Sequence, residues 1–154
     1  MSEKAVIEKT FNEDLHVDDE VSQGKILCQI YLKVESDEDA LENAVDSIVV
    51  EPFTMDSNID LLEVKVHEIE KGDKFLGVVE TKMLVRDFRT LAAVVMGYGP
   101  VAVRIVKPER INITIDQLHS MLVEISEMSQ NLSNQITSML TDTERRKMYS
   151  GLKK

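Results

Sequence analysis

The chain has one cysteine, Cys28, among 154 residues, and it has no tryptophan. A single cysteine excludes an intramolecular disulfide and a metal centre built from several cysteines of one chain. Cys28 lies in the apolar run of residues 26–30, where a cysteine is typically a small buried side chain rather than a reactive thiol. We therefore expect neither a disulfide framework nor a cysteine nucleophile.

Long apolar runs are also missing. No run approaches the roughly 20 residues that a helix needs to cross a bilayer, and no N-terminal segment resembles a secretory signal. Lysine and arginine number 18 against 28 aspartates and glutamates, which gives a formal net charge of −10. An acidic chain disfavours nucleic-acid binding, because that binding depends on neutralising phosphates. We expect a cytoplasmic protein that binds neither nucleic acid nor membrane.

Recognisable catalytic motifs are absent from the sequence. It contains no P-loop, no dinucleotide fingerprint and no nucleophile elbow. Its three histidines, His16, His67 and His119, share no metal-ligand spacing. The many carboxylates show no pairing that would orient a general acid and a base. We therefore expect no catalytic residues, no metal site, no cofactor and no enzymatic activity.

The middle of the chain alternates between strand and helix patterns. Apolar and polar residues alternate with a period of two in four stretches, residues 25–34, 61–69, 75–84 and 101–106. Acidic residues after Ser36 favour a helix start, and Pro52 is expected to end that helix before a loop over residues 51–58. Asp87 is expected to cap a second helix, and Gly97 to end it in the left-handed conformation.

This order of strand, helix, strand, strand, helix and strand predicts an α+β, ferredoxin-like domain over residues 25–110. Both helices would cover one face of an antiparallel sheet, leaving the other face for the C-terminal helix or a second copy. Residues 1–24 form an acidic arm, part of which has an edge-strand pattern, with a solvated linker over 18–24. The arm carries two lysines against seven acids, the domain 11 basic against 16 acidic residues, and residues 111–154 five of each.

The segment from Asp87 to Glu109 carries a family resemblance. It reads Asp-Phe-Arg, then Leu91, then Met-Gly-Tyr-Gly-Pro-Val-Ala-Val-Arg-Ile-Val-Lys-Pro-Glu. It resembles the end of the C-terminal extension domain of WYL-type bacterial transcription regulators, where a short helix leads through a Tyr-Gly turn into a strand that ends on Pro-Glu. Taken over residues 25–109, the resemblance implies a ferredoxin-like module for ligand sensing or oligomerisation. The chain lacks a helix-turn-helix and a WYL domain, so no DNA binding is implied.

The strongest pattern lies in residues 115–140, where apolar residues recur at alternating steps of three and four. This register predicts a long amphipathic helix, with Ser129 as its single polar member. Thr114 and Gln117 have the spacing of a capping box at the helix start. The apolar members, which we call the seam, are Ile115, Leu118, Leu122, Ile125, Leu132, Ile136 and Met139.

A narrow seam needs a partner surface, either a second chain or the protein's own sheet, and the pattern leaves both open. We expect a non-enzymatic, self-associating regulatory, adaptor or assembly module, a homodimer or a higher homo-oligomer, with room for a further protein partner. The expected interface residues are Leu118, Leu122, Ile125, Leu132, Ile136 and Met139. The alternative is a small-molecule-sensing domain of ferredoxin-like type. It would bind an anionic ligand near the turn of residues 97–100, through Arg89, Tyr98, Gly99 and Arg104.

Overall fold

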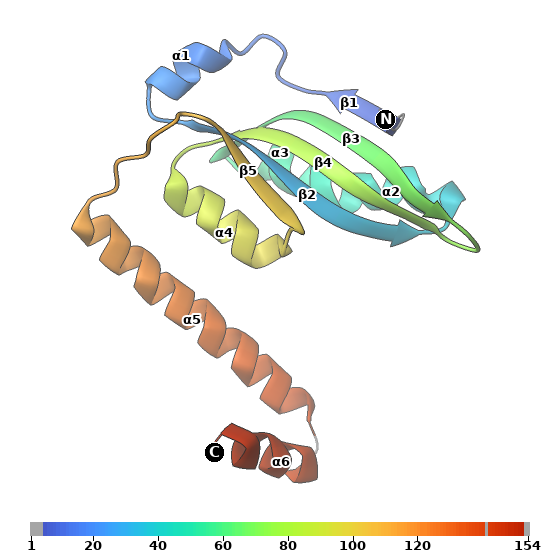
Figure 1. The fold of residues 1–154 in the computed structure, drawn as a ribbon, viewed down its shortest axis with the longest axis vertical. Helices are drawn as coiled ribbons and strands as arrows, with labels where there is room; N and C mark the ends of the chain where they lie inside the picture. Colours follow the sequence, from blue (N-terminus) through green and yellow to red (C-terminus); the bar gives the residue numbers. More distant parts are fainter. Residues whose placement is uncertain (1–4, 141, 153–154) are drawn as a thin grey trace. The chain divides into compact units, whose positions relative to one another are not determined.

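A computed structural model describes residues 5–140 and 142–152. The first residues of the expected arm, Thr141 and the last two residues of the tail lie outside the described residues. The chain divides into two compact units, Met1–Ile111 and Asn112–Lys154, and each is described by itself. The protein has a mixed α+β fold with an antiparallel sheet and a long C-terminal helix, as predicted at that level, but the sheet has five strands where the sequence predicts four (Figure 1).

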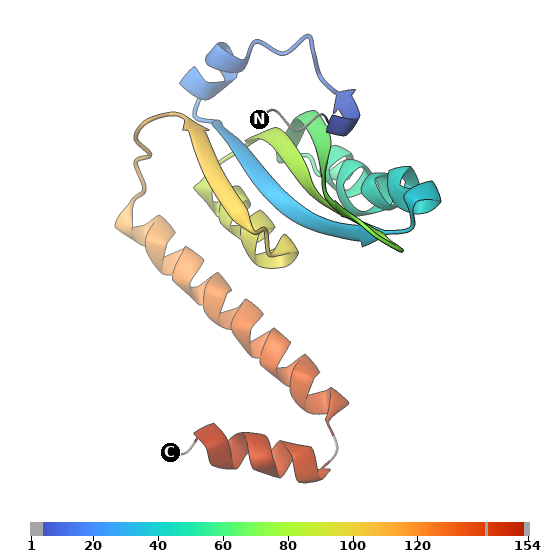
Figure 2. The same ribbon diagram turned by 45° about the vertical axis from the view of Figure 1, so that its right-hand side comes forward.

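The sheet of the first unit has the strand order β1-β3-β4-β2-β5, and every neighbouring pair is antiparallel. Its strands are β1 (Ala5–Thr10), β2 (Ile26–Ser36), β3 (Ile59–Lys71), β4 (Phe75–Val85) and β5 (Ala102–Lys107). The hairpin between β3 and β4 turns at Gly72 and Asp73, where the sequence predicts it. The helices α2 (Leu41–Val45), α3 (Glu51–Met55) and α4 (Phe88–Tyr98) cover one face of this sheet (Figures 1 and 2).

The core lies between the sheet and these helices. Alternate residues of β2, from Ile26 to Val34, are buried, and their cross-strand neighbours on β4 are buried too. The strand period of two directs both sets toward the same face. From the helices, buried side chains pack against this surface: Leu41, Val45, Val49, Phe53, Leu91 and Val94. Cys28 is fully buried among them, as the sequence predicts.

Pro52 does not end the first helical segment, so the predicted loop over residues 51–58 is wrong in its first half. A short 3-10 turn, η1 (Glu38–Ala40), leads into α2, which is followed by a π-helical turn, η2 (Asp46–Val50), and then by α3. The α-helical hydrogen-bond pattern begins again after the π turn, so Pro52 falls in the first turn of α3. In that turn the backbone nitrogen does not need to donate a hydrogen bond within the helix, so a proline is tolerated. The continued helix places Phe53 in the core.

The N-terminal residues belong to the first unit's sheet. β1 pairs with β3, and Ile7 packs against the core. Lys9 Nζ donates to Asp46 Oδ1 at 2.9 Å. The expected solvated linker is wrong, because α1 (Val17–Ser22) forms there, with three acidic residues in its first turn where the helix dipole favours them. Lys25 Nζ then lies 2.6 Å from Glu20 Oε2 and 2.8 Å from an Asp60 oxygen on β3.

The second helix ends two residues later than predicted. Asp87 caps α4 by accepting from the Thr90 amide at 2.8 Å, as expected. Gly97 remains inside the helix, and Gly99 adopts the left-handed conformation, with φ 59° and ψ 52°. The Gly99 amide donates to the Val95 carbonyl at 3.0 Å, which satisfies one of the last free carbonyls of the helix.

The second unit contains α5 (Ile115–Met139) and α6 (Asp142–Leu152). α5 begins at the predicted capping box, and a shorter helix, α6, follows it. Among the described helices, none combines the length and apolar character needed to cross a membrane.

Candidate functional site

The predicted interface residues all lie on α5 and are exposed. Their relative exposure runs from 39% at Leu118 to 84% at Met139, whereas the buried residues of β2 are at most 6% exposed. The spacing of three and four residues places them on one side of the helix. α5 therefore presents an apolar stripe along its whole length, interrupted once by the exposed side chain of Ser129.

The positions that flank the seam carry no basic residue. One flank has His119, Ser126 and Ser133, and the other has Met121, Met128 and Gln135. The acidic residues of the helix, Asp116, Glu124 and Glu127, lie away from the seam. Ion pairs between flanking residues normally set whether two helices pair in a parallel or an antiparallel direction. Because these positions hold no lysine or arginine, side-chain packing has to set the direction here.

The four residues of the alternative ligand site do not form one cluster. Arg89 is in the first turn of α4 and Tyr98 is its last residue, about 13 Å further along the helix axis. The Tyr98 ring contacts Phe53 in the helix layer, with ring centroids 4.7 Å apart. Burial raises the pKa of the Tyr98 hydroxyl, with Asp56 adding to the effect.

Arg104 is separated from Tyr98 by the sheet. Arg104 lies on β5, opposite Gln29 of β2. Its neighbours in sequence, Val103 and Ile105, lie opposite buried residues of β2. Its side chain therefore belongs to the face that the helices do not cover. Gly99, at the end of α4, contributes a backbone turn and no side chain.

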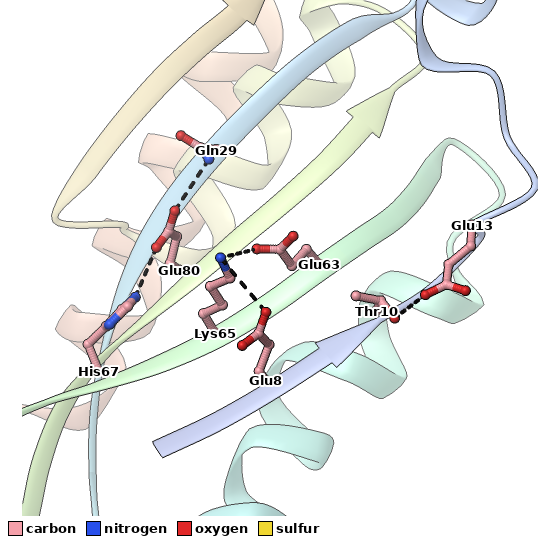
Figure 3. Close-up of polar contacts among 8 residues, drawn as sticks. All are labelled: Glu8, Thr10, Glu13, Gln29, Glu63, Lys65, His67 and Glu80. Carbon is pink, nitrogen blue, oxygen red and sulfur yellow. Dashed lines mark hydrogen bonds and ion pairs between the residues drawn. The ribbon is translucent and has the colours of Figure 1, made fainter. Parts of the chain in front are cut away.

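The uncovered face carries a polar chain that the sequence analysis did not identify (Figure 3). His67 Nε2 lies 2.9 Å from Glu80 Oε2, and Gln29 Nε2 donates to the other Glu80 oxygen at 3.3 Å. Tyr31 Oη donates to Oε1 of the Gln29 side chain at 3.4 Å. The alternation within each strand places these residues on its polar face, and this can be read from the sequence. Which strands become neighbours, and so which of these residues meet, depends on long-range strand pairing.

Lys65 forms a second group beside this chain. Its Nζ lies 2.8 Å from Glu63 on its own strand and 3.9 Å from Glu8 on β1. The hydrogen bond that the Lys65 ammonium donates to the Glu63 carboxylate raises the pKa of Lys65. Since these side chains are partly exposed, the group contributes little net stability but links β1 to β3 through side chains as well as backbone.

The described contacts of the polar face include one oriented imidazole, that of His67. Glu80 orients the His67 ring, but the described contacts of that ring include no hydroxyl or thiol that it would activate. Burial raises the pKa of the Cys28 thiol to about 12, so the thiolate is scarce at neutral pH. Over residues 5–140 and 142–152, no group of three or more His, Cys, Asp or Glu side chains is placed to hold a metal ion.

The comparisons with known proteins give one positive result. Residues 12–150 match the family model described as the MJ0538 family. No curated protein and no solved structure matches the chain. The matched segment begins just after β1 and runs through both structural units into α6. Because the match covers well over half of the sequence, the chain belongs to the MJ0538 family.

Proposed function

We propose that this protein is a non-enzymatic, self-associating regulatory or assembly module, and that α5 is the interface with a second copy. The observation that carries the proposal is the exposed seam of α5, every expected member of which is at least 39% exposed. Monomeric soluble proteins rarely expose long contiguous apolar surfaces, and such surfaces typically mark interaction sites.

The length of the helix supports this interpretation. At 1.5 Å per residue, the 25 residues of α5 extend over about 37 Å. Burying one leucine or isoleucine side chain fully contributes about 1.5–3 kcal/mol, so a seam of this length offers a substantial driving force for pairing. A second copy supplies a surface of matching length and chemistry without any further partner.

We also propose that β2 to β5 and their helices form a ferredoxin-like domain, to which β1 adds a fifth strand. The order β3-β4-β2-β5 supports this, since β4 is inserted between β2 and β3 as in a split β-α-β unit. The resemblance of residues 25–109 to the WYL-type extension domain is compatible with the same order. Ligand sensing is less favoured, because Arg89, Tyr98 and Arg104 lie apart.

Two neighbouring residues of α5 provide a matched test of the interface. Leu122 is in the seam and 62% exposed, whereas Val123 is outside the seam and 57% exposed. We expect Leu122→Asp to convert a dimer into a folded monomer, because pairing would bury an unpaired carboxylate. Val123→Asp should leave the oligomer intact, since its side chain points about 100° away around the helix.

Size-exclusion chromatography with light scattering measures the mass, and circular dichroism checks that each variant folds. A wild-type chain that is monomeric at every concentration would overturn the proposal. So would a Leu122→Asp variant that keeps the wild-type mass. Equal dissociation by both variants would show that the seam is not the interface.

A further inference from the structure

We infer that the two α5 helices of the pair run antiparallel, in a register centred on residue 127. This inference rests on the proposed function, because it specifies how the second copy lies on the seam. It follows from the spacing of the seam, the position of Ser129, the residues beside the seam and the distribution of charge between the two units.

The seam residues are symmetric about residue 127. In the antiparallel register each one faces a seam residue or Ser129 of the second copy, and no position is left over at either end. The four distinct layers join Ile115 to Met139, Leu118 to Ile136, Leu122 to Leu132, and Ile125 to Ser129. The full length of α5, from its first residue to its last, is then used.

Ser129 distinguishes the two directions of pairing. Parallel helices would place Ser129 against Ser129, so the smallest side chains of the seam would share one layer and leave a gap. Antiparallel helices place each Ser129 against Ile125 of the second copy, which combines a small with a large side chain. Interiors favour such even filling, and unfilled volume costs stability.

The flanking residues favour the same direction. In a parallel pair the methionine flank of one helix would face the serine flank of the other. In the antiparallel pair like flanks meet, so Met128 faces Met128 of the second copy. This places flexible apolar side chains on one side of the seam and widens the dry contact. Met121 does not add to that contact, because its side chain is already only 8% exposed in the single chain.

The net charge gives the fourth argument. Residues 1–110 carry the whole formal charge of −10, whereas residues 111–154 carry five basic and five acidic residues. Residues 112–114 tether the acidic unit to the first turn of α5. Parallel helices would attach both acidic units at one end of the pair. Antiparallel helices attach them about 37 Å apart, several times the Debye length of about 8 Å at physiological salt.

Single-cysteine cross-linking tests the direction. Ile115→Cys and Met139→Cys place thiols at the two ends of the seam, where the native side chains are 65% and 84% exposed. The native Cys28 is fully buried, so the wild-type chain serves as the control that should not cross-link. One variant carries an affinity tag of different mass. The two variants are mixed, unfolded, refolded together and mildly oxidised, and the products are identified by mass spectrometry.

We expect a covalent dimer only in the mixture, joining Cys at 115 of one chain to Cys at 139 of the other. If each variant instead links to itself, the helices are parallel, which overturns this inference and leaves self-association standing. A dimeric wild type with no cross-link in the mixture overturns the register. A monomeric wild type with no cross-link overturns the proposed function as well.

Discussion

Thr114 and Gln117 cap the start of α5 by exchanging two hydrogen bonds. The Thr114 amide donates to Gln117 Oε1 at 2.9 Å, and the Gln117 amide donates to Thr114 Oγ1 at 3.2 Å. Each bond satisfies an amide that the helix itself leaves without an acceptor. The pair therefore fixes the residue at which the helix begins, and with it the register of the seam.

Removal of this cap should destabilise α5. We expect Thr114→Ala to cost about 1 kcal/mol, because the Gln117 amide loses its acceptor. Thermal unfolding followed by helix ellipticity measures the loss. Ser120→Ala, which also removes an exposed hydroxyl but inside α5, should be neutral or slightly stabilising, since alanine is the better helix former. Equal losses in both variants would contradict the capping role.

The two glycines near the end of α4 should respond in opposite ways. Gly99 has a positive φ, so Gly99→Ala should cost about 1 kcal/mol in the free energy of unfolding. Gly97 is helical and a side chain there would meet nothing within 4 Å, so Gly97→Ala should be neutral or stabilise by up to about 1 kcal/mol. Urea unfolding of both variants makes the comparison. A larger loss at Gly97 would place the helix end where the sequence alone suggested.

Cys28 should make stability fall at alkaline pH. Its pKa rises from the ordinary 9.0 to about 12 by burial, so the folded chain keeps a proton that the unfolded chain releases. The free energy of unfolding therefore keeps its full value below pH 9.0. It declines as the pH rises toward 12, by at most about 1.4 kcal/mol per pH unit.

Between pH 9.0 and 10.0 the Cys28 contribution to the decline is the largest. Tyr98 and the lysines with raised pKa values have ordinary values of 10.0 and 10.5, so their contributions begin to fall near the top of this interval and continue above it. Urea unfolding at several pH values should show the decline in the wild type and a shallower decline in Cys28→Ala. A Cys28→Ala profile as steep as the wild-type one would exclude the thiol as its cause.

Deletion of residues 1–22 should lower the melting temperature but preserve a cooperative transition. The deletion removes β1 and α1, with the packing of Ile7 and the ion pair from Lys9 to Asp46. Neither element contributes a fully buried side chain, and the buried core begins at Ile26. Scanning calorimetry tests both parts of the expectation. A broad, non-cooperative transition would show that the edge strand is required for folding.

Local patterns predicted much of the fold because their causes lie within a few residues. The capping box of Thr114 and Gln117, the helix cap of Asp87 and the hairpin turn at Gly72 each depend on neighbours in sequence. The alternation in β2 predicted its buried face for the same reason. The position of Pro52 was misjudged because a π turn, which no local spacing announces, moved the proline into the first turn of a helix.

The sequence by itself determined the periodicity of the α5 seam, the order of strands and helices from β2 to β5 and the buried state of Cys28, since periodicity and capping act over single turns. Only the tertiary structure decided that β1 pairs with β3, that His67 meets Glu80, and that Arg104 lies on the opposite face of the sheet from Tyr98. Those outcomes depend on which strands become neighbours. Strand pairing is set by the packing of distant residues into one core, and no local pattern contains that information.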